Sequence, residues 1–320
     1  MKQFTLILLI TLFSISCSKD RSQPQSEEVH QADLQIIVPG FNSERAFSYL
    51  LKQTSFGPRN PGSKGHQQCL DFLTREMQSL LKSAERQTFT LDGYDGEKLH
   101  LTNIFSRVNP ASTTRILLTA HWDTRPRADE DKDPRKQNQP ILGANDAASG
   151  IAVLLEIANA LKQVPPKIGV DILLNDGEDY GKEADIGNYF LGTKYFAKHL
   201  NSDYHPIFGI LLDMVGDRNL EIMKEPISMR NAPEVVDLVW STARSLGVYQ
   251  FTENVQRPVL DDHIPLNEAG IKTIDLIDFA YPDSSNRYWH TTEDTPDKCS
   301  PESLEAVGRV LLDIIYHQPS

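Results

Sequence analysis

The stretch LLTAHWDTRP, residues 117–126, starts as an apolar run and ends in polar side chains. The run LLTA is typical of a buried strand, and His121 and Asp123 follow where that strand would end. Three other hydrophobic runs, VDILLN, FGILLDMVG and TIDLIDF, also lead into polar residues. These are Asp176, Glu178 and Asp179 after the first, Asp213 within the second, and His290 at the end of a loop after the third. The repetition predicts that strand ends deliver polar side chains to one place.

Helical patterns alternate with these strand patterns. ASGIAVLLEIANALKQV, residues 148–164, has an apolar face, and we expect Ser149 to cap its start. KIGVDILLND, residues 167–176, has a continuous apolar centre, as expected for a strand covered on both faces. Further helices are predicted over 43–54, 66–81, 232–247 and 300–318, and further strands over 99–108, 114–121, 205–216 and 271–279. This alternation predicts a single-domain α/β fold, with a mostly parallel twisted central sheet and helices on both faces.

The composition is that of an ordinary globular protein. Hydrophobic residues make up 39% and charged residues 24% of the 320 residues, and the formal net charge is −12. An acidic chain without clustered Lys and Arg argues against a nucleic-acid partner. Residues 123–140 form a charged, proline-broken stretch, which predicts a long surface loop beside the acids that follow the strand.

The N-terminus has the features of an export signal. Lys2 precedes the apolar run FTLILLITLF, which is too short to span a bilayer comfortably. We expect a signal peptide over residues 1–16, a flexible tether over 17–35, and a catalytic domain over 36–320. Small residues before Cys17 resemble a bacterial lipoprotein signal, with a plain signal peptide as the alternative. The protein is therefore expected to be exported, and either periplasmic or lipid-anchored to a bacterial membrane. Whether Cys69 and Cys299 form a disulfide stays open at this point.

The polar strand ends point to a metal. In open α/β sheets, ligands bind beyond the carboxyl ends of the strands. Asp146 directly precedes the helix over 148–164 and can join the same crevice. Converging carboxylates repel one another and cost desolvation unless a cation neutralises them. A mixture of carboxylate and imidazole ligands suits Zn²⁺, whose catalytic sites usually have three protein ligands.

Seven segments in order resemble the M28 zinc peptidases and, within them, the glutaminyl-peptide cyclotransferases of animal type and their bacterial relatives. The resemblance covers roughly residues 40–316 and is carried by GPRNPGS, LLTAHWDTRP, GANDAASGIAVLLEIA, LLNDGED, GILLDMVG, DDHIP and YWHTTEDTPD. It implies an enzyme that cyclises N-terminal glutaminyl residues of peptides and proteins to pyroglutamate and releases ammonia. We expect a monomer.

The resemblance also implies roles for individual residues. Asp146, Asp179 and His290 would hold a single zinc ion, with Glu178 as general acid and base. Asp213 and Asp261 would share a carboxylate network with Glu178, although the adjacent Asp262 leaves the second position ambiguous. Trp289 would form part of the substrate pocket, and His121 and Asp123 would support the metal site.

Two departures from the family pattern stand out. The usual Gly-Glu-Glu is Gly177-Glu178-Asp179 here, so one expected ligand is a methylene shorter. The segment YGKEADIGNYFLG, residues 180–192, contains no counterpart of the second pocket tryptophan of the cyclases.

Two other functions remain open. The first is a two-zinc aminopeptidase of the same fold, in which His121 and Asp213 become metal ligands. The second is a metal-free binding lipoprotein that kept the fold and lost the chemistry.

Overall fold

The computed structural model describes residue 1, residues 36–182 and residues 185–319. The expected signal peptide over 1–16 and tether over 17–35 lie outside these residues, apart from Met1. From Ile36 onward the chain forms one compact unit. Among the described helices, none is long and apolar enough to cross a membrane.

A six-stranded sheet organises this unit, with strand order β1-β2-β4-β3-β5-β8. Its strands are β1 (Glu85–Asp92), β2 (Lys98–Val108), β3 (Arg115–His121), β4 (Gly169–Asn175), β5 (Gly209–Asp213) and β8 (Thr273–Ile277). Strand β3 pairs in parallel with β4 and β5, and β5 pairs in parallel with β8, whereas β2 runs antiparallel to both β1 and β4. A separate two-stranded sheet contains β6 (Ile222–Lys224) and β7 (Phe251–Val255). The predicted mostly parallel sheet is confirmed.

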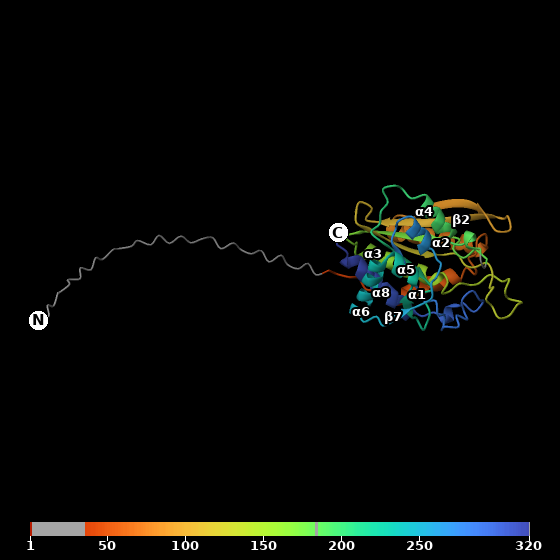
Figure 1. Ribbon diagram of the computed structural model, residues 1–320. Helices are drawn as coiled ribbons and strands as arrows, with labels where there is room; N and C mark the ends of the chain where they lie inside the picture. Colours follow the sequence, from red (N-terminus) through yellow and green to blue (C-terminus); the bar gives the residue numbers. More distant parts are fainter. Residues whose placement is uncertain (2–35, 183–184, 320) are drawn as a thin grey trace. The chain divides into compact units, whose positions relative to one another are not determined.

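Helices cover both faces of the sheet, as predicted. One core joins strand residues such as Ile116 and Leu118 to α1 (Ser43–Thr54), α2 (Lys64–Leu81), α3 (Ala148–Gln163), α6 (Pro233–Ser245) and α8 (Pro301–His317). A second core joins Leu117 and Leu173, which point the other way, to α4 (Leu191–Lys198) and α7 (His263–Glu268). Figure 1 shows α1, α6 and α8 gathered on one side of the molecule. The remaining helices are α5 (Pro226–Asn231) and two 3-10 turns, Ile186–Asn188 and Pro296–Lys298.

The start of α3 differs from the prediction in a way that matters for the site. Ser149 lies inside the helix and does not cap it. Its hydroxyl instead donates to the Asn145 carbonyl at 2.5 Å and accepts the Val215 backbone N–H at 3.0 Å. A Cβ on Gly150 would lie 2.5 Å from the Leu212 carbonyl oxygen, so glycine lets α3 approach β5 closely. These contacts fix the segment before α3 against the segment after β5.

The predicted ends of α6 and α8 are confirmed. Pro233 lies in the first turn of α6, and Gly247, with φ of +67°, follows its C-cap. The Ser300 side chain caps α8 by accepting the Ser303 N–H.

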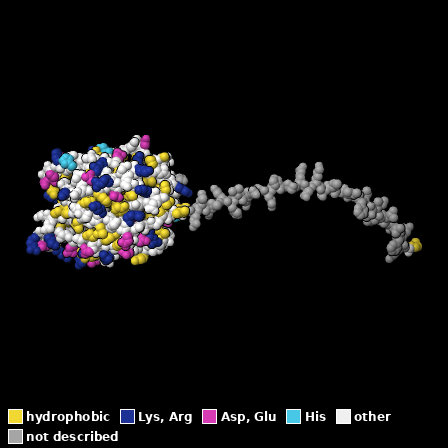
Figure 2. All heavy atoms as spheres, turned by 180° about the vertical axis from the view of Figure 1, so that it is seen from behind, with side chains coloured by type: hydrophobic (Ala, Val, Ile, Leu, Met, Phe, Trp, Pro, Cys, Tyr) yellow, Lys and Arg dark blue, Asp and Glu magenta, His cyan; other side chains and the backbone are white. Residues whose placement is uncertain are grey.

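Cys69 and Cys299 are free, buried thiols, so they do not pair with each other. On the face shown in Figure 2, basic, acidic and hydrophobic side chains are interspersed.

Candidate metal centre

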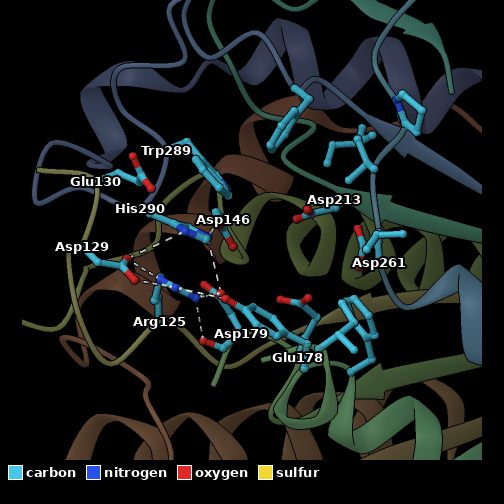
Figure 3. A pocket seen from close by; sticks show the side chains of 18 of the residues that line it. Arg125, Asp129, Glu130, Asp146, Glu178, Asp179, Asp213, Asp261, Trp289 and His290 are labelled. Carbon is cyan, nitrogen blue, oxygen red and sulfur yellow. Dashed lines mark hydrogen bonds and ion pairs between the residues drawn. The ribbon is translucent and has the colours of Figure 1, made fainter. Parts of the chain in front are cut away.

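The carboxyl ends of the parallel strands open into a pocket of about 670 Å³. The pocket lining includes most of the residues expected to act, namely Asp146, Glu178, Asp179, Asp213, Asp261, Trp289 and His290. Asp213 ends β5, and Glu178 and Asp179 follow the turn after β4. His121, the last residue of β3, and Asp123 lie buried behind this lining. Figure 3 shows carboxylates from several elements pointing toward one space.

Asp146, Asp179 and His290 form a cluster suited to a metal ion. One ligand atom from each lies within 4.8 Å of the other two. His290 Nε2 lies 3.6 Å from Asp146 Oδ2 and 3.4 Å from Asp179 Oδ1. Zinc bonds of about 2.0–2.1 Å place two ligand atoms of a tetrahedral site about 3.3 Å apart. Within the described part of the chain, Asp179 Oδ2 is buried and has no hydrogen-bond partner. The donors and their spacing therefore fit zinc.

A second cluster shares Asp146 with the first and contains His121 and Asp213. His121 Nε2 lies 3.2 Å from a carboxylate oxygen of each acid. Burial alone would lower the pKa of His121, but hydrogen bonds with Asp123, Asp146 and Asp213 raise it well above its usual range. This position can hold either a second cation or the imidazolium of His121 itself.

Backbone contacts position the candidate ligands. Asp123 accepts the backbone N–H of Glu178 at 3.0 Å and that of Asp179 at 3.4 Å, which fixes the turn after β4. Asp294 accepts the backbone N–H groups of Asn145 and Asp146 at 2.8 and 3.1 Å. Sequence reasoning missed Asp294, although it lies in the segment YWHTTEDTPD, because its partners are about 150 residues away in the chain.

The carboxyl groups beside the metal cluster have raised pKa values. Burial raises the pKa of Glu178 well above its usual range, the positive charge of His121 opposes this, and the carboxyl groups of Asp179, Asp261 and Asp262 raise the pKa again. Burial also raises the pKa of Asp213 and Asp261. Asp261 lines the pocket. Asp262 points instead toward Asn175 and accepts a hydrogen bond from its side-chain amide N–H at 2.8 Å. Of the two adjacent acids, the structure brings Asp261 to the pocket.

Three non-glycine residues at the site have left-handed backbone conformations. The φ angles are +58° for Phe190, +49° for Met214 and +54° for His290. Such conformations cost free energy and cluster at functional sites. Trp289 stacks on the His290 ring at a centroid distance of 3.7 Å and packs edge-on against Phe279.

The structure adds pocket residues that the sequence did not suggest. Ile186, Tyr189 and Phe190 line the wall formed by the segment that lacks a second tryptophan. On another wall, Arg257 lies over the Phe279 ring at 4.2 Å. Arg125 and Asp129 lie beside the metal cluster and were not singled out. Arg125 occurs in the quoted LLTAHWDTRP, but its position there shows only that it follows the strand.

The fold and the site define a metal-dependent enzyme of the zinc exopeptidase type. The family model for Peptidase family M28 matches residues 103–315, so the chain belongs to this family, and the resemblance found in the sequence is confirmed.

Individual relatives agree with this assignment. A glutaminyl-peptide cyclotransferase-like protein of Mus musculus is 26% identical over 93% of this chain and 81% of its own length. The crystal structure of Tannerella forsythia glutaminyl cyclase is 38% identical, covers 88% of this chain and 100% of its own, and superposes with a TM-score of 0.84. A Zn-dependent exopeptidase from Parabacteroides distasonis gives the same identity, coverage and TM-score.

Proposed function

We propose that this protein is a glutaminyl-peptide cyclotransferase, which converts N-terminal glutaminyl residues to pyroglutamate and releases ammonia. The carrying observation is the buried Glu178 carboxyl, which lines one pocket with the cluster of Asp146, Asp179 and His290. The similarity to glutaminyl cyclases along most of the chain supports the same activity.

In this proposal Asp146, Asp179 and His290 hold one zinc ion. Bound there, zinc supplies Lewis-acid polarisation of the substrate γ-carboxamide. Glu178 accepts a proton from the substrate α-amine, and the amine nitrogen forms a bond to the carbonyl carbon of the γ-carboxamide, Cδ of the glutaminyl residue. The bond from that carbon to its amide nitrogen then breaks, and Glu178 returns the proton to the departing ammonia. Because amine and carboxamide belong to one residue, orientation contributes much of the rate.

The remaining residues tune and shape this site. Asp213 and Asp261 share protons with Glu178 and keep its pKa high enough for a base near neutral pH. Trp289 forms a wall of the substrate pocket. His121, between Asp123, Asp146 and Asp213, acts as an imidazolium that neutralises acids where related peptidases hold a second metal.

The raised pKa of Glu178 has a testable consequence for the pH profile. The base works only when deprotonated, so kcat/KM falls as the pH decreases through its raised pKa. Asp261→Asn removes a negative neighbour, which makes Glu178 easier to deprotonate and should move the acid limb to lower pH. Asp203→Asn, on an exposed loop, is the matched control. An acid limb that does not move in Asp261→Asn contradicts the shared network.

A single assay tests the proposed function. The zinc-loaded protein is incubated with a peptide that begins with Gln, and the products are analysed by mass spectrometry. The proposal predicts loss of one ammonia from an intact chain. Release of a free amino acid would instead support a two-zinc aminopeptidase, which the second cluster of His121, Asp146 and Asp213 favours. An unchanged peptide would contradict both activities.

The proposal extends to the cellular location. The apolar run and Cys17 support export of the catalytic domain, residues 36–320, held to a bacterial membrane by a lipid on Cys17 after cleavage of residues 1–16. The proposal takes this domain to be a monomer. Cell fractionation tests this, because Cys17→Ser should release the protein from the membrane fraction.

A further inference from the structure

The buried guanidinium of Arg125 lies beside two of the candidate metal ligands, Asp179 and His290. Arg125 is 2% exposed and lies in the loop after β3. Its Nη1 donates to Asp179 Oδ1 at 2.6 Å, and its Nε and Nη2 donate to the two carboxylate oxygens of Asp129, each at 2.6 Å. Nη2 also donates to the Tyr189 hydroxyl at 3.1 Å. Figure 3 shows Arg125 between Asp129 and Asp179, directly beside His290.

These contacts orient the carboxylate of Asp179. Arg125 occupies one acceptor position of Oδ1, which also lies 3.4 Å from His290 Nε2. Oδ2 is buried, and the described residues offer it no hydrogen-bond partner. A carboxylate has about four acceptor positions, so the contact with Arg125 fixes the group and leaves the others available. Asp179 is one methylene shorter than the Glu that is usual here in the family. Its carboxylate therefore has less freedom to adjust to a metal ion and must be held in the ligating orientation.

The same guanidinium also holds a second carboxylate, that of Asp129, near the candidate histidine ligand. Asp129 Oδ1 lies 4.0 Å from His290 Nδ1, the ring nitrogen that faces away from Asp146 and Asp179. Metal-bound histidines usually have a carboxylate, carbonyl or water at their other nitrogen. The planar fork of Arg125 holds Asp129 by two parallel hydrogen bonds, which a Lys side chain cannot reproduce.

We propose that Arg125 is a positioning residue of the metal site, which holds Asp179 directly in its ligating orientation and places the Asp129 carboxylate beside the outer ring nitrogen of His290. This inference rests on the proposed zinc site. It assigns Arg125 a geometric role, since its positive charge by itself opposes the binding of a cation. Removing the fork should therefore weaken zinc binding even when the charge is kept.

The test compares Arg125→Lys with Arg127→Lys, the same change two residues later. Arg127 donates to the Tyr180 and Gly181 carbonyls, and its Nε lies 3.8 Å from Asp129. Zinc affinity of each metal-free protein is measured by competition with a chromophoric chelator. We expect Arg125→Lys to bind zinc about 10- to 100-fold more weakly than wild type, the usual range for such supporting residues, and Arg127→Lys to remain close to wild type. The visible spectrum of the Co²⁺ form should change in Arg125→Lys only.

Wild-type zinc affinity and an unchanged Co²⁺ spectrum in Arg125→Lys would overturn the proposal. If that variant does not fold, Asp129→Asn decides the question: weaker zinc binding supports the positioning role, and unchanged binding overturns it. None of these readouts uses catalysis. Failure of the wild type to cyclise a Gln peptide would count against the proposed function and leave the role of Arg125 to be judged by zinc affinity.

Discussion

Replacing Glu178 by Gln should reduce kcat for cyclisation by about 10²- to 10⁴-fold, the range expected for loss of a general acid and base. The amide has nearly the same shape but cannot accept the proton of the α-amine. Glu178 lies outside both ligand clusters, and its nearest approach to His121 Nδ1 is 3.9 Å. Zinc content should therefore stay at the wild-type value.

The measurement combines steady-state kinetics on a Gln peptide with metal analysis of the same sample. Glu293→Gln, the same chemical change on an exposed loop residue, is the control and should retain full activity. A fully active Glu178→Gln protein would remove Glu178 from the mechanism. Loss of zinc together with activity would show that Glu178 helps to hold the metal and would not support a role in proton transfer.

Replacing His290 by Ala should abolish measurable zinc binding and, with it, cyclisation. The change removes the only nitrogen donor of the cluster of Asp146, Asp179 and His290. Losing a supporting residue costs about 10- to 100-fold in metal affinity, and losing a ligand should cost more. A ligand that binds the folded state at 100 times its Kd stabilises it by about 2.7 kcal/mol. Zinc should therefore raise the melting temperature of the wild type but not that of the variant.

Thermal unfolding with and without zinc measures this effect. His317→Ala, on the exposed end of α8, is the control and should keep the zinc-dependent shift. The metal-free forms of wild type and His290→Ala serve as the baseline, because alanine keeps the Cβ and leaves the left-handed backbone strain at this position unchanged. A zinc-dependent shift of wild-type size in His290→Ala would place the metal elsewhere.

The sequence predicted the elements whose apolar pattern is long and continuous. Strands β3, β4 and β5 are buried at every position, and the pattern identifies them directly. Strand β1 was missed because it pairs only with β2 in this sheet, and Phe89 is its one buried residue. Helices α4, α5 and α7 have 8, 6 and 6 residues. Helices this short depend on tertiary packing and leave a weak periodic signal.

The residues of the site also divide into those that the sequence predicts and those that it does not. Residues at strand ends, such as His121 and Asp213, were predictable because parallel strands deliver their carboxyl ends to one edge. The contact between Arg125 and Asp179 was not predictable, because the two residues meet only after two loops fold together. Tyr189 and Phe190 were also missed as pocket residues. Phe190 has a left-handed backbone at the start of α4, a conformation that sequence patterns rarely predict for a phenylalanine.

Anomalous diffraction at the zinc edge from crystals of the zinc-loaded protein tests the central claim most directly. The account predicts one strong peak per chain, within bonding distance of Asp146, Asp179 and His290, about 2.0–2.2 Å from their ligand atoms. A second peak of similar height between His121, Asp146 and Asp213 would contradict the single-zinc assignment. A peak away from both clusters, or none at saturating zinc, would contradict the metal centre itself.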